Sequence, residues 1–462
     1  MPLPLDWLVV SEPMIDAVVE HTIGTRIETI PEPAREAARL LLLDAFGVGA
    51  SGAATAESAI VRRASAAWGN GAEASIWAGN ASSTAGTAAF VNAHQMHTQE
   101  FDAIHEAAVV HPLTVVVPAV VAWMQRASKA GRTFSGADLL TATVVGVDVA
   151  AGLGRAATSA IQFFRPSVCG GMGATAAVAS ADRTPADITK AAFGIAYGSV
   201  SGTMQPHTEG APVLATQCGL NARAALSAHD LAVAGLAGPE FILEGRYGWF
   251  TLIERSGDPL SFVQSLGQRW EIAETSIKPF PSGRATHGGL DGALTLQRDH
   301  GFLIDEVATV TVRVPPLVFD LVGRRPEAGM DVGAARLCLA LLIPHVLRDG
   351  TIDLSTYAPD RLNDPALLAL AEHVTIERDD NHDPNAFTPQ EVVVTLRDGR
   401  RLSTTLTDVL GSPGHPVSQA GIEAKFRSNL ASVGRDQAAG DIIDLVSHLD
   451  DLDDVSSLLD LL

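Results

Sequence analysis

Apolar residues recur at helical spacing through the first half of the chain. The segment AREAARLLLLDAFGVGASG, which follows Pro31 and Pro33, has apolar residues every three or four positions and ends in small residues. Proline near the start and glycine at the exit are typical of a helix. The same spacing returns in ESAIVRRASAAW, in SSTAGTAAFVNAHQ and in SGADLLTATVVGVDVAAGLGRAA, where Ser135 is a candidate N-cap. The pattern predicts a body of packed helices.

The pattern changes to alternation of apolar and polar residues in the last third of the chain. The segments EVATVTVRVPP (306–316) and QEVVVTLRDGRRLSTTL (390–406) alternate, and HVTIERDD does so between them. Alternation over five or more residues predicts strands with one buried face, and Asp398-Gly399 between two such runs predicts a hairpin. Helical spacing between the strands, near 285–300 and 332–347, indicates an α/β module.

These two patterns predict an α+β fold with two domains. We expect a large all-helical domain formed by residues 1–267 together with 409–462, because helical spacing returns after the last strand. Residues 268–408 are expected to form a smaller inserted α/β lid. A chain of 462 residues exceeds what one core usually supports, which agrees with two domains.

Composition and charge limit the classes of binding partner that are expected. Hydrophobic residues make up 47% of the chain and charged residues 18%, so a buried core is expected. The formal net charge of −21 repels nucleic acid and anionic membranes. The sequence contains no long, purely apolar run, so no membrane span is expected. The three cysteines are far apart and odd in number, and the N-terminus does not resemble a signal peptide. We therefore expect a cytoplasmic protein.

Seven titratable side chains gather within eighteen residues just before an apolar segment. They are His94, His97, Glu100, Asp102, His105, Glu106 and His111. Such density beside a buried segment predicts a pocket in which burial and neighbouring charges tune a general base. The alternative is a solvated turn ahead of a core helix. The spacings match no zinc motif and no cysteine lies nearby, so no metal is expected.

A second cluster begins the predicted lid. Lys278, Arg284, His287 and Asp291 fall within fourteen residues, in IKPFPSGRATHGGLDGA. Arg284 and His287 are three residues apart and would share one face of a helix. A site between two domains is a usual place for a small molecule, whereas the alternative is a surface turn with ordinary basic residues. The glycines at 170–173 lack the partners of a phosphate loop and predict close helix packing, so no nucleotide cofactor is expected.

The order and spacing of these motifs resemble the MmgE/PrpD family, whose members include 2-methylcitrate dehydratase, cis-aconitate decarboxylase and iminodisuccinate epimerase. The resemblance rests on LLLDAFGVGASG (41–52), AAFVNAHQMHTQEFDAIHE (88–106), GPEFILEGRYGWF (238–250) and the IKPFPSGRATHGG motif. It implies a helical domain with an α/β lid, a homodimer, and an active site between the domains with neither metal nor organic cofactor. The variant QEFDAIHEAAVVHP looks closest to the epimerase branch.

The resemblance also implies roles for individual residues. The catalytic set is Asp102, His111, Lys278 and His287, and the substrate-binding set is Glu100, His105, Arg165 and Arg284. Glu100 is the alternative to Asp102 for the acidic position, and the base could be any of His105, His111 and His287. Two positions depart from the decarboxylase and dehydratase branches, which usually have histidine at Arg165 and lysine at Leu214.

The expected function is cofactor-independent chemistry at a carbon next to a carboxylate of a small di- or tricarboxylate. Arginine and lysine would hold the carboxylates and histidine would move the proton. An epimerase needs no acid for a leaving group, so the departures at Arg165 and Leu214 favour epimerisation of an iminodisuccinate-like substrate. The alternatives are a lyase, either dehydratase or decarboxylase, and a binding protein without catalysis. The retained cluster of titratable residues argues against the binding protein.

Overall fold

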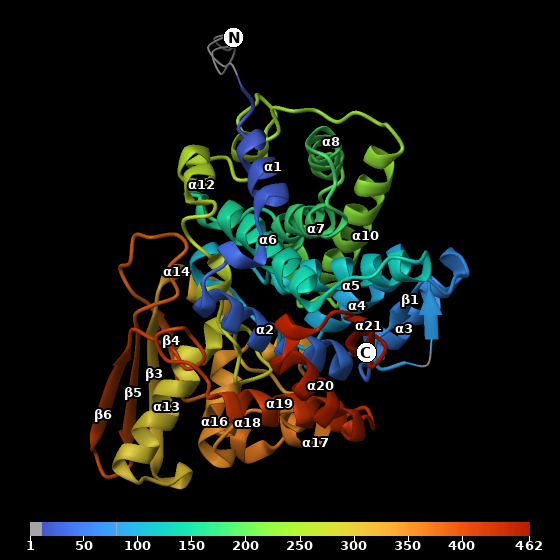
Figure 1. Ribbon diagram of the computed structural model, residues 1–462. Helices are drawn as coiled ribbons and strands as arrows, with labels where there is room; N and C mark the ends of the chain where they lie inside the picture. The colour runs from blue at the N-terminus through green and yellow to red at the C-terminus, as the bar shows by residue number, and fades with distance from the viewer. Residues whose placement is uncertain (1–11, 80) are drawn as a thin grey trace.

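The computed structural model describes residues 12–79 and 81–462, and it has a helical body and a smaller α/β part (Figure 1). The α+β fold class predicted from the sequence is confirmed. The helices of the body are α1 (Ile15–Gly24), α2 (Glu32–Gly52), α3 (Ala56–Ser65), α4 (Ala85–His97), α5 (Leu113–Lys129), α6 (Gly136–Arg155), α7 (Arg165–Asp182), α8 (Ala186–Tyr197), α9 (Gln205–Glu209), α10 (Val213–Val233), α11 (Trp249–Leu252) and α12 (Pro259–Ser265).

Small residues allow the central helices of the body to approach closely. A Cβ atom built on Gly173 of α7 would lie 2.3 Å from the carbonyl oxygen of Gly146 on α6, and one on Gly170 would lie 2.6 Å from Val115 of α5. Both contacts are too short for any side chain. The glycines of α7 thus serve helix packing, as the sequence predicts. By length and composition α6 could cross a membrane, but 83% of its most apolar window is buried inside the protein.

The α/β part contains one four-stranded sheet with helices packed against it. Its strands are β3 (Val307–Val314), β4 (Val374–Arg378), β5 (Gln390–Leu396) and β6 (Arg401–Leu406), in the order β4-β3-β5-β6. Strands β3 and β4 are parallel, whereas β5 is antiparallel to both β3 and β6. Its helices are α13 (His287–His300), α14 (Pro316–Val322), α15 (Val332–Arg336), α16 (Leu339–Asp349), α17 (Pro359–Leu362) and α18 (Pro365–Ala371).

The predicted hairpin forms between β5 and β6. Gly399 has a φ of 90°, which favours glycine, and its backbone N–H donates to the Leu396 carbonyl at 3.0 Å. Alternation also sets the burial, since Val392 and Val394 of β5 face the core of this part. The strand predictions are confirmed here because period-two alternation is a local property that tertiary contacts did not override.

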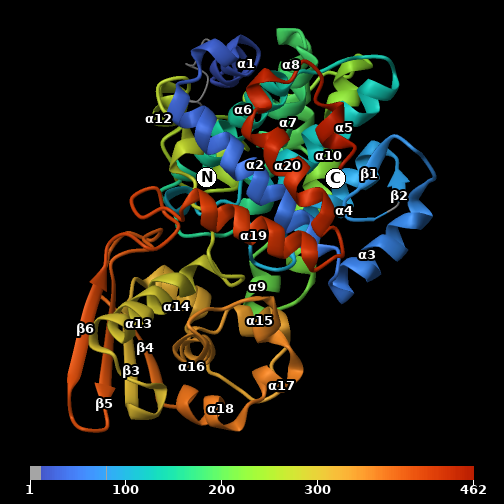
Figure 2. The same ribbon diagram turned by 60° about the horizontal axis from the view of Figure 1, so that its bottom comes forward.

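The C-terminal helices α19 (Gln419–Ala431), α20 (Ala439–Ser447) and α21 (Ser456–Leu459) return to the helical body. Figure 2 shows α19 alongside α2. A Cβ on Gly47 of α2 would lie only 2.7 Å from the ring of Phe426, so the two helices touch. This packing supports our division into a helical domain (1–267 plus 409–462) and a lid (268–408), which we keep as a proposal.

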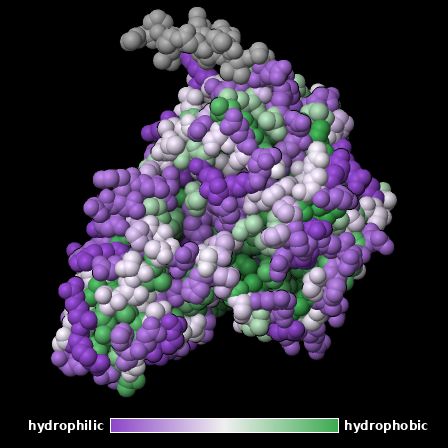
Figure 3. All heavy atoms as spheres, turned by 60° about the vertical axis from the view of Figure 1, so that its left-hand side comes forward, coloured by the Kyte–Doolittle hydropathy of each residue, from purple (hydrophilic) through white to green (hydrophobic). Residues whose placement is uncertain are grey.

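The helical domain also contains strands that the sequence did not predict. β1 (Ala74–Ile76) and β2 (Ala81–Ser83) pair antiparallel, so the domain is not purely helical. Runs of three residues are too short for alternation to indicate a strand. Hydrophilic side chains cover much of the face drawn in Figure 3, with hydrophobic patches between them.

Candidate active site

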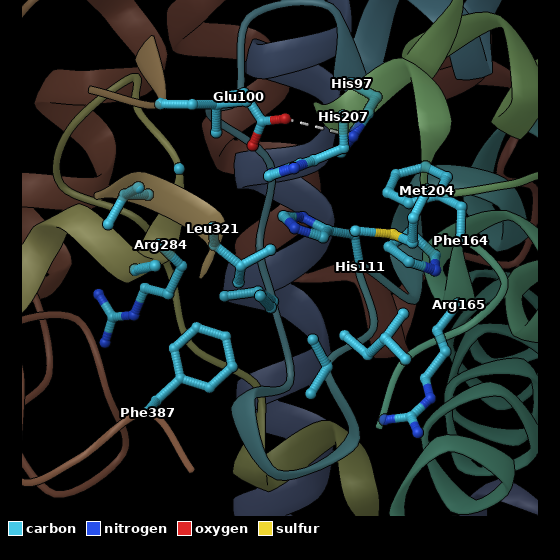
Figure 4. A pocket seen from close by; sticks show the side chains of 18 residues that line it. His97, Glu100, His111, Phe164, Arg165, Met204, His207, Arg284, Leu321 and Phe387 are labelled. Carbon is cyan, nitrogen blue, oxygen red and sulfur yellow. Dashed lines mark ion pairs between the residues drawn. The ribbon is translucent and has the colours of Figure 1, made fainter. Parts of the chain in front are cut away.

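A cavity lies between the helical domain and the lid (Figure 4). The helical domain lines it with His97, Glu100, His111, Phe164, Arg165, Met204 and His207, among others, and the lid contributes Arg284, Leu321, Leu337 and Phe387. The two titratable clusters recognised in the sequence therefore meet at one cavity. In Figure 4 the imidazoles of His111 and His207 face Leu321, Phe387 and Arg284 across it.

Two imidazoles share one carboxylate on the helical side of the cavity. Nδ1 of His97, the last residue of α4, lies 2.8 Å from Oδ2 of Asp102, and Nδ1 of His111 lies 3.1 Å from the same oxygen. The hydroxyl of Thr114 donates to this oxygen as well. A carboxylate only accepts hydrogen bonds, so Nδ1 of His97 carries a proton, whereas Nδ1 of His111 lies at ion-pair distance from Asp102 without a hydrogen bond. Nε2 of His111, without a hydrogen-bond partner among the described residues, can accept a proton.

The surroundings move the pKa values of the two histidines apart. Burial lowers the pKa of His111, and the positive charge of Lys278 lowers it further against the pull of Asp102. Burial also opposes protonation of His97, but the carboxylates of Asp102 and Glu100 outweigh it and raise the pKa of that ring. Although burial acts to raise it, His111 and His97 hold the pKa of Asp102 well below its ordinary value. The pair thus offers a base in His111 and an acid in His97.

Lys278 lies beneath the cavity wall and is fully buried. Its Nζ donates to the Glu100 carbonyl at 2.9 Å, and it lies 3.3 Å from Oε2 of Glu100 and 3.9 Å from Oδ1 of Asp102. Burial would raise the pKa of Glu100, but Lys278 and His97 lower it to about 2. Neither Lys278 nor Asp102 lines the cavity, and the catalytic roles of both residues stay predictions.

The loop that carries these residues is conformationally strained. Glu100 and Val109 have φ values of 53° and 54°, in the left-handed region that non-glycine residues seldom adopt. Such residues cost on the order of 1 kcal/mol each and gather at functional sites. Here they turn the chain between α4 and α5 so that Glu100 and His111 both reach the cavity.

On the lid side, Arg284 is the cation that lines the cavity. It lies in a short 3-10 helix (Arg284–Thr286), with Nε 2.7 Å from Oε1 of Glu106 and Nη1 donating to the Leu410 carbonyl at 2.7 Å. His287 lies behind it. Its Nε2 donates to the Ser282 carbonyl at 3.3 Å, so its Nδ1 accepts from Arg284 at 3.2 Å.

His287 is a buried, neutral ring behind Arg284. Burial, together with the charge of Arg284, holds the pKa of His287 well below its ordinary value, so the ring is neutral. The ring is fully buried and does not line the cavity. The catalytic role of His287 stays a prediction, and the contact that the structure does show for its Nδ1 is the one with the Arg284 guanidinium.

His105 does not line this cavity. Its Nε2 lies 2.8 Å from Oε2 of Glu271 and its Nδ1 accepts the backbone N–H of Ala108, so the ring faces away from the cavity. The substrate-binding role of His105 stays a prediction, and in this structure both of its ring nitrogens contact protein groups.

Arg165 lines the cavity, but its charge is already neutralised. Its Nη2 lies 2.9 Å from Oε2 of Glu254, and its Nη1 donates to Oδ1 of Asn385 at 3.0 Å. With these partners in place, Arg165 ties α7 to the lid, and its substrate-binding role stays a prediction.

The structure adds His97 and His207 to the site. His97 stood in the first cluster, five residues before Asp102, so the sequence contained a signal for it. His207 lies on the short helix α9, and burial lowers its pKa to about 4. A neutral ring at this position can donate or accept a hydrogen bond but contributes no charge.

Among the residues that the structure describes, two groups of side chains have ligand atoms close enough together for a metal ion: His97, Asp102 and His111, and His105, Glu271 and Glu274. In the first group the ammonium of Lys278 lies 3.9 Å from Asp102, which would place a second cation against the metal. In the second group Arg155 lies 3.0 Å from Glu271 and 2.6 Å from Glu274. These donor sets fit hydrogen-bonded networks better than a metal, and the absence of a cofactor stays a prediction.

The protein has a helical domain and an α/β lid, and imidazoles line the cavity between them. These features are those of a two-domain α+β enzyme. Comparison with known families is more specific. Residues 17–260 match the MmgE/PrpD N-terminal domain and residues 280–451 match the MmgE/PrpD C-terminal domain. The chain belongs to the MmgE/PrpD family. The C-terminal match includes α19 and α20, although these helices pack on the helical domain.

The chain is similar to several cis-aconitate decarboxylases. It is 25% identical over 452 residues to the human enzyme, covering 95% of this chain and 92% of the relative, and 26% identical over 459 residues to the mouse enzyme, covering 95% and 91%. It is 27% identical over 397 residues to the Aspergillus terreus enzyme, covering 81% and 80%. These relatives favour a lyase over the epimerase that the motif variants suggested.

Proposed function

We propose that this protein is a lyase acting at a carbon next to a carboxylate of a small di- or tricarboxylate. Among lyase reactions, decarboxylation of a cis-aconitate-like substrate comes first, because relatives with that name match 95% of the chain. Dehydration of a 2-methylcitrate-like substrate is the second candidate, since the family includes such enzymes. A homodimer and a cytoplasmic location stay predictions from the resemblance and the composition.

The observation that carries this proposal is the one-sided placement of the proton-transfer groups. His97, His111 and His207 all line the cavity from the helical domain, whereas the lid contributes Arg284 and apolar side chains. An epimerase must remove a proton from one face of a carbon and return it to the other. No imidazole or carboxyl group among the described lid residues lines this cavity. The geometry therefore favours chemistry on a single face.

The residues fit the demands of both lyase reactions. When a carboxylate leaves as CO₂, the electron pair of the broken bond stays on the carbon chain and must be protonated, which an imidazolium such as His97 can do. In a dehydration, neutral His111 would remove the proton and His97 would protonate the departing hydroxide. In either reaction Arg284 stabilises a substrate carboxylate within a largely apolar cavity, where a fixed cation acts strongly.

The proposal is tested by incubating the purified protein with cis-aconitate in heavy water. We expect release of CO₂ and a product with one deuteron bound to carbon, measured by gas detection and NMR. Water loss from 2-methylcitrate without CO₂ release would support the dehydratase instead. Deuterium incorporated into an otherwise unchanged substrate, together with inversion at that carbon, would indicate an epimerase and contradict the proposal.

Arg284→Lys should reduce kcat/KM by about 10- to 100-fold, because a charge-assisted hydrogen bond contributes on the order of 1.5–3 kcal/mol and lysine is only a point charge. The thermal midpoint should change less than activity. Steady-state kinetics and thermal unfolding measure the two effects. Arg298→Lys is the matched control, since Arg298 is exposed on the neighbouring α13. Equal activity in the two variants would remove Arg284 from the substrate site.

A further inference from the structure

A second cavity adjoins the first at Glu100. Both cavities are lined by His97, Glu100 and Leu337, so these three side chains form a shared wall. The second cavity also lies between the domains, with Leu214 of α10 on one side and Arg336 of α15 on the other.

Arg336 differs from the other buried arginines. Three arginines in the described part of the chain are more than nine-tenths buried, namely Arg165, Arg284 and Arg336. Arg165 pairs with Glu254 and Arg284 pairs with Glu106. Arg336, 7% exposed, forms no ion pair with a described carboxylate. Removing a guanidinium from water costs several kcal/mol unless an anion compensates it.

The contacts that Arg336 does form leave two of its three guanidinium nitrogens without a hydrogen-bond partner among the described residues. Nη1 donates to the Thr98 carbonyl at 2.6 Å, and the group stacks on the ring of Tyr357, with 4.9 Å from Cζ to the ring centroid. Nε is buried without a hydrogen-bond partner, and Nη2 has none among the described residues. The Nε and Nη2 edge is the one that binds a carboxylate with two parallel hydrogen bonds.

The charges nearby allow an anion at this position. Glu100 is the carboxylate of the shared wall, and Lys278 lies 3.3 Å from it on the buried side and offsets its charge. Glu57 and Asp331 also line the cavity, but neither pairs with Arg336, and Asp331 accepts the backbone N–H of Gly333 as the cap of α15. Arg336 is therefore a fixed cation, held by Thr98 and Tyr357, that forms no ion pair with a described carboxylate.

We propose that this second cavity is the other half of the substrate site, and that Arg336 binds the substrate carboxylate farthest from the carbon at His111. This inference rests on the proposed function and makes it more specific. Arg284 and Arg336 contact different cavities on either side of the His97–Glu100 wall, so the site selects substrates with at least two separated carboxylates. Arg336 thereby determines specificity and takes no part in proton transfer.

The test compares two ligands that differ by one carboxylate. Tricarballylate has three carboxylates, and methylsuccinate is the same molecule without one terminal carboxylate. By titration calorimetry the wild-type protein should bind tricarballylate about 10- to 100-fold more tightly than methylsuccinate, as expected for one charge-assisted bidentate contact. Arg336→Gln should bind the two ligands equally, and Arg336→Lys should retain part of the difference.

The matched control is Arg325→Gln, which removes the same charge from an exposed position on the lid and should keep the full discrimination. If the role of Arg336 were purely structural, its replacement would weaken the binding of both ligands by the same factor and leave the ratio of the two affinities unchanged. If both Arg336 variants keep the fold, as judged by circular dichroism, and the ratio of the two affinities is unchanged, the inference about Arg336 is wrong. The proposed function is not affected by that result. If tricarballylate fails to bind the wild-type protein, the proposed substrate class is wrong as well.

Discussion

Replacing His111 by alanine is expected to lower kcat by a factor of about 10²–10⁴, which is the usual contribution of a positioned general acid or base. Nδ1 of His111 lies 3.1 Å from Oδ2 of Asp102, so Nε2 is the nitrogen available for substrate. Binding of tricarballylate should change little, because His111 is neutral and adds no charge. His300→Ala, at an exposed position of α13, is the control and should be fully active.

The pH profile gives the same prediction a second measurement. His111 works as a base only when neutral, and its pKa is lowered, so activity should persist below pH 6.5 and fall only as the pH drops through that lowered pKa. His97 works as an acid only when protonated, and its pKa is raised, so activity should decline as the pH rises through a value above 6.5. The two rings share Asp102, so the apparent pKa values of the acidic and basic limbs of the pH profile describe the pair and not either histidine alone. A profile with both limbs unchanged in His111→Ala would contradict the assignment.

Lys278→Met is expected to lower the free energy of unfolding at pH 7 by about 3–5 kcal/mol, the usual effect of removing one partner of a buried ion pair. The substitution leaves the carboxylates of Glu100 and Asp102 buried without their nearest ammonium group. Urea unfolding measures the change. Lys190→Met is the control, because Lys190 pairs with Asp16 near the surface and such pairs contribute about 0–1 kcal/mol.

The sign of the pH dependence follows from Glu100. Its pKa in the folded protein is lowered from 4.5 to about 2, so the stability that its charge contributes is present above pH 4.5 and is lost as the pH falls towards 2. The difference between wild type and Lys278→Met should therefore shrink over that range. Equal destabilisation by the Lys278 and Lys190 variants at pH 7 would show that Lys278 does not stabilise the site.

The fold was largely predictable because its signals are local. Alternation located β3, β5 and β6, and Asp398-Gly399 located the hairpin between the last two. Helical spacing located the long helices of the body. The pair β1 and β2 was missed because each strand has only three residues. The order of strands in the sheet, with β3 in the centre beside β4, depends on contacts between distant segments that periodicity does not contain.

The candidate site was predictable only in part, because side-chain direction in a loop is not a sequence pattern. His97 faces the cavity and His105 does not, although they stand in one cluster, since the left-handed residues Glu100 and Val109 redirect the chain between α4 and α5. The pairing of Arg165 with Glu254 joins residues far apart in sequence, so Arg165 looked like a free cation. Arg336 was overlooked because an unpaired guanidinium can be recognised only when its surroundings are known.

The central claim is that both domains contribute to one polycarboxylate site, and a crystal structure with tricarballylate bound tests it most directly. We expect the ligand to extend across the wall formed by His97 and Glu100, with one carboxylate on Arg284 and another on the Nε and Nη2 edge of Arg336. A carbon of the ligand should lie within about 3.5 Å of Nε2 of His111. A ligand bound elsewhere, or within one cavity without contact to either arginine, would contradict the account.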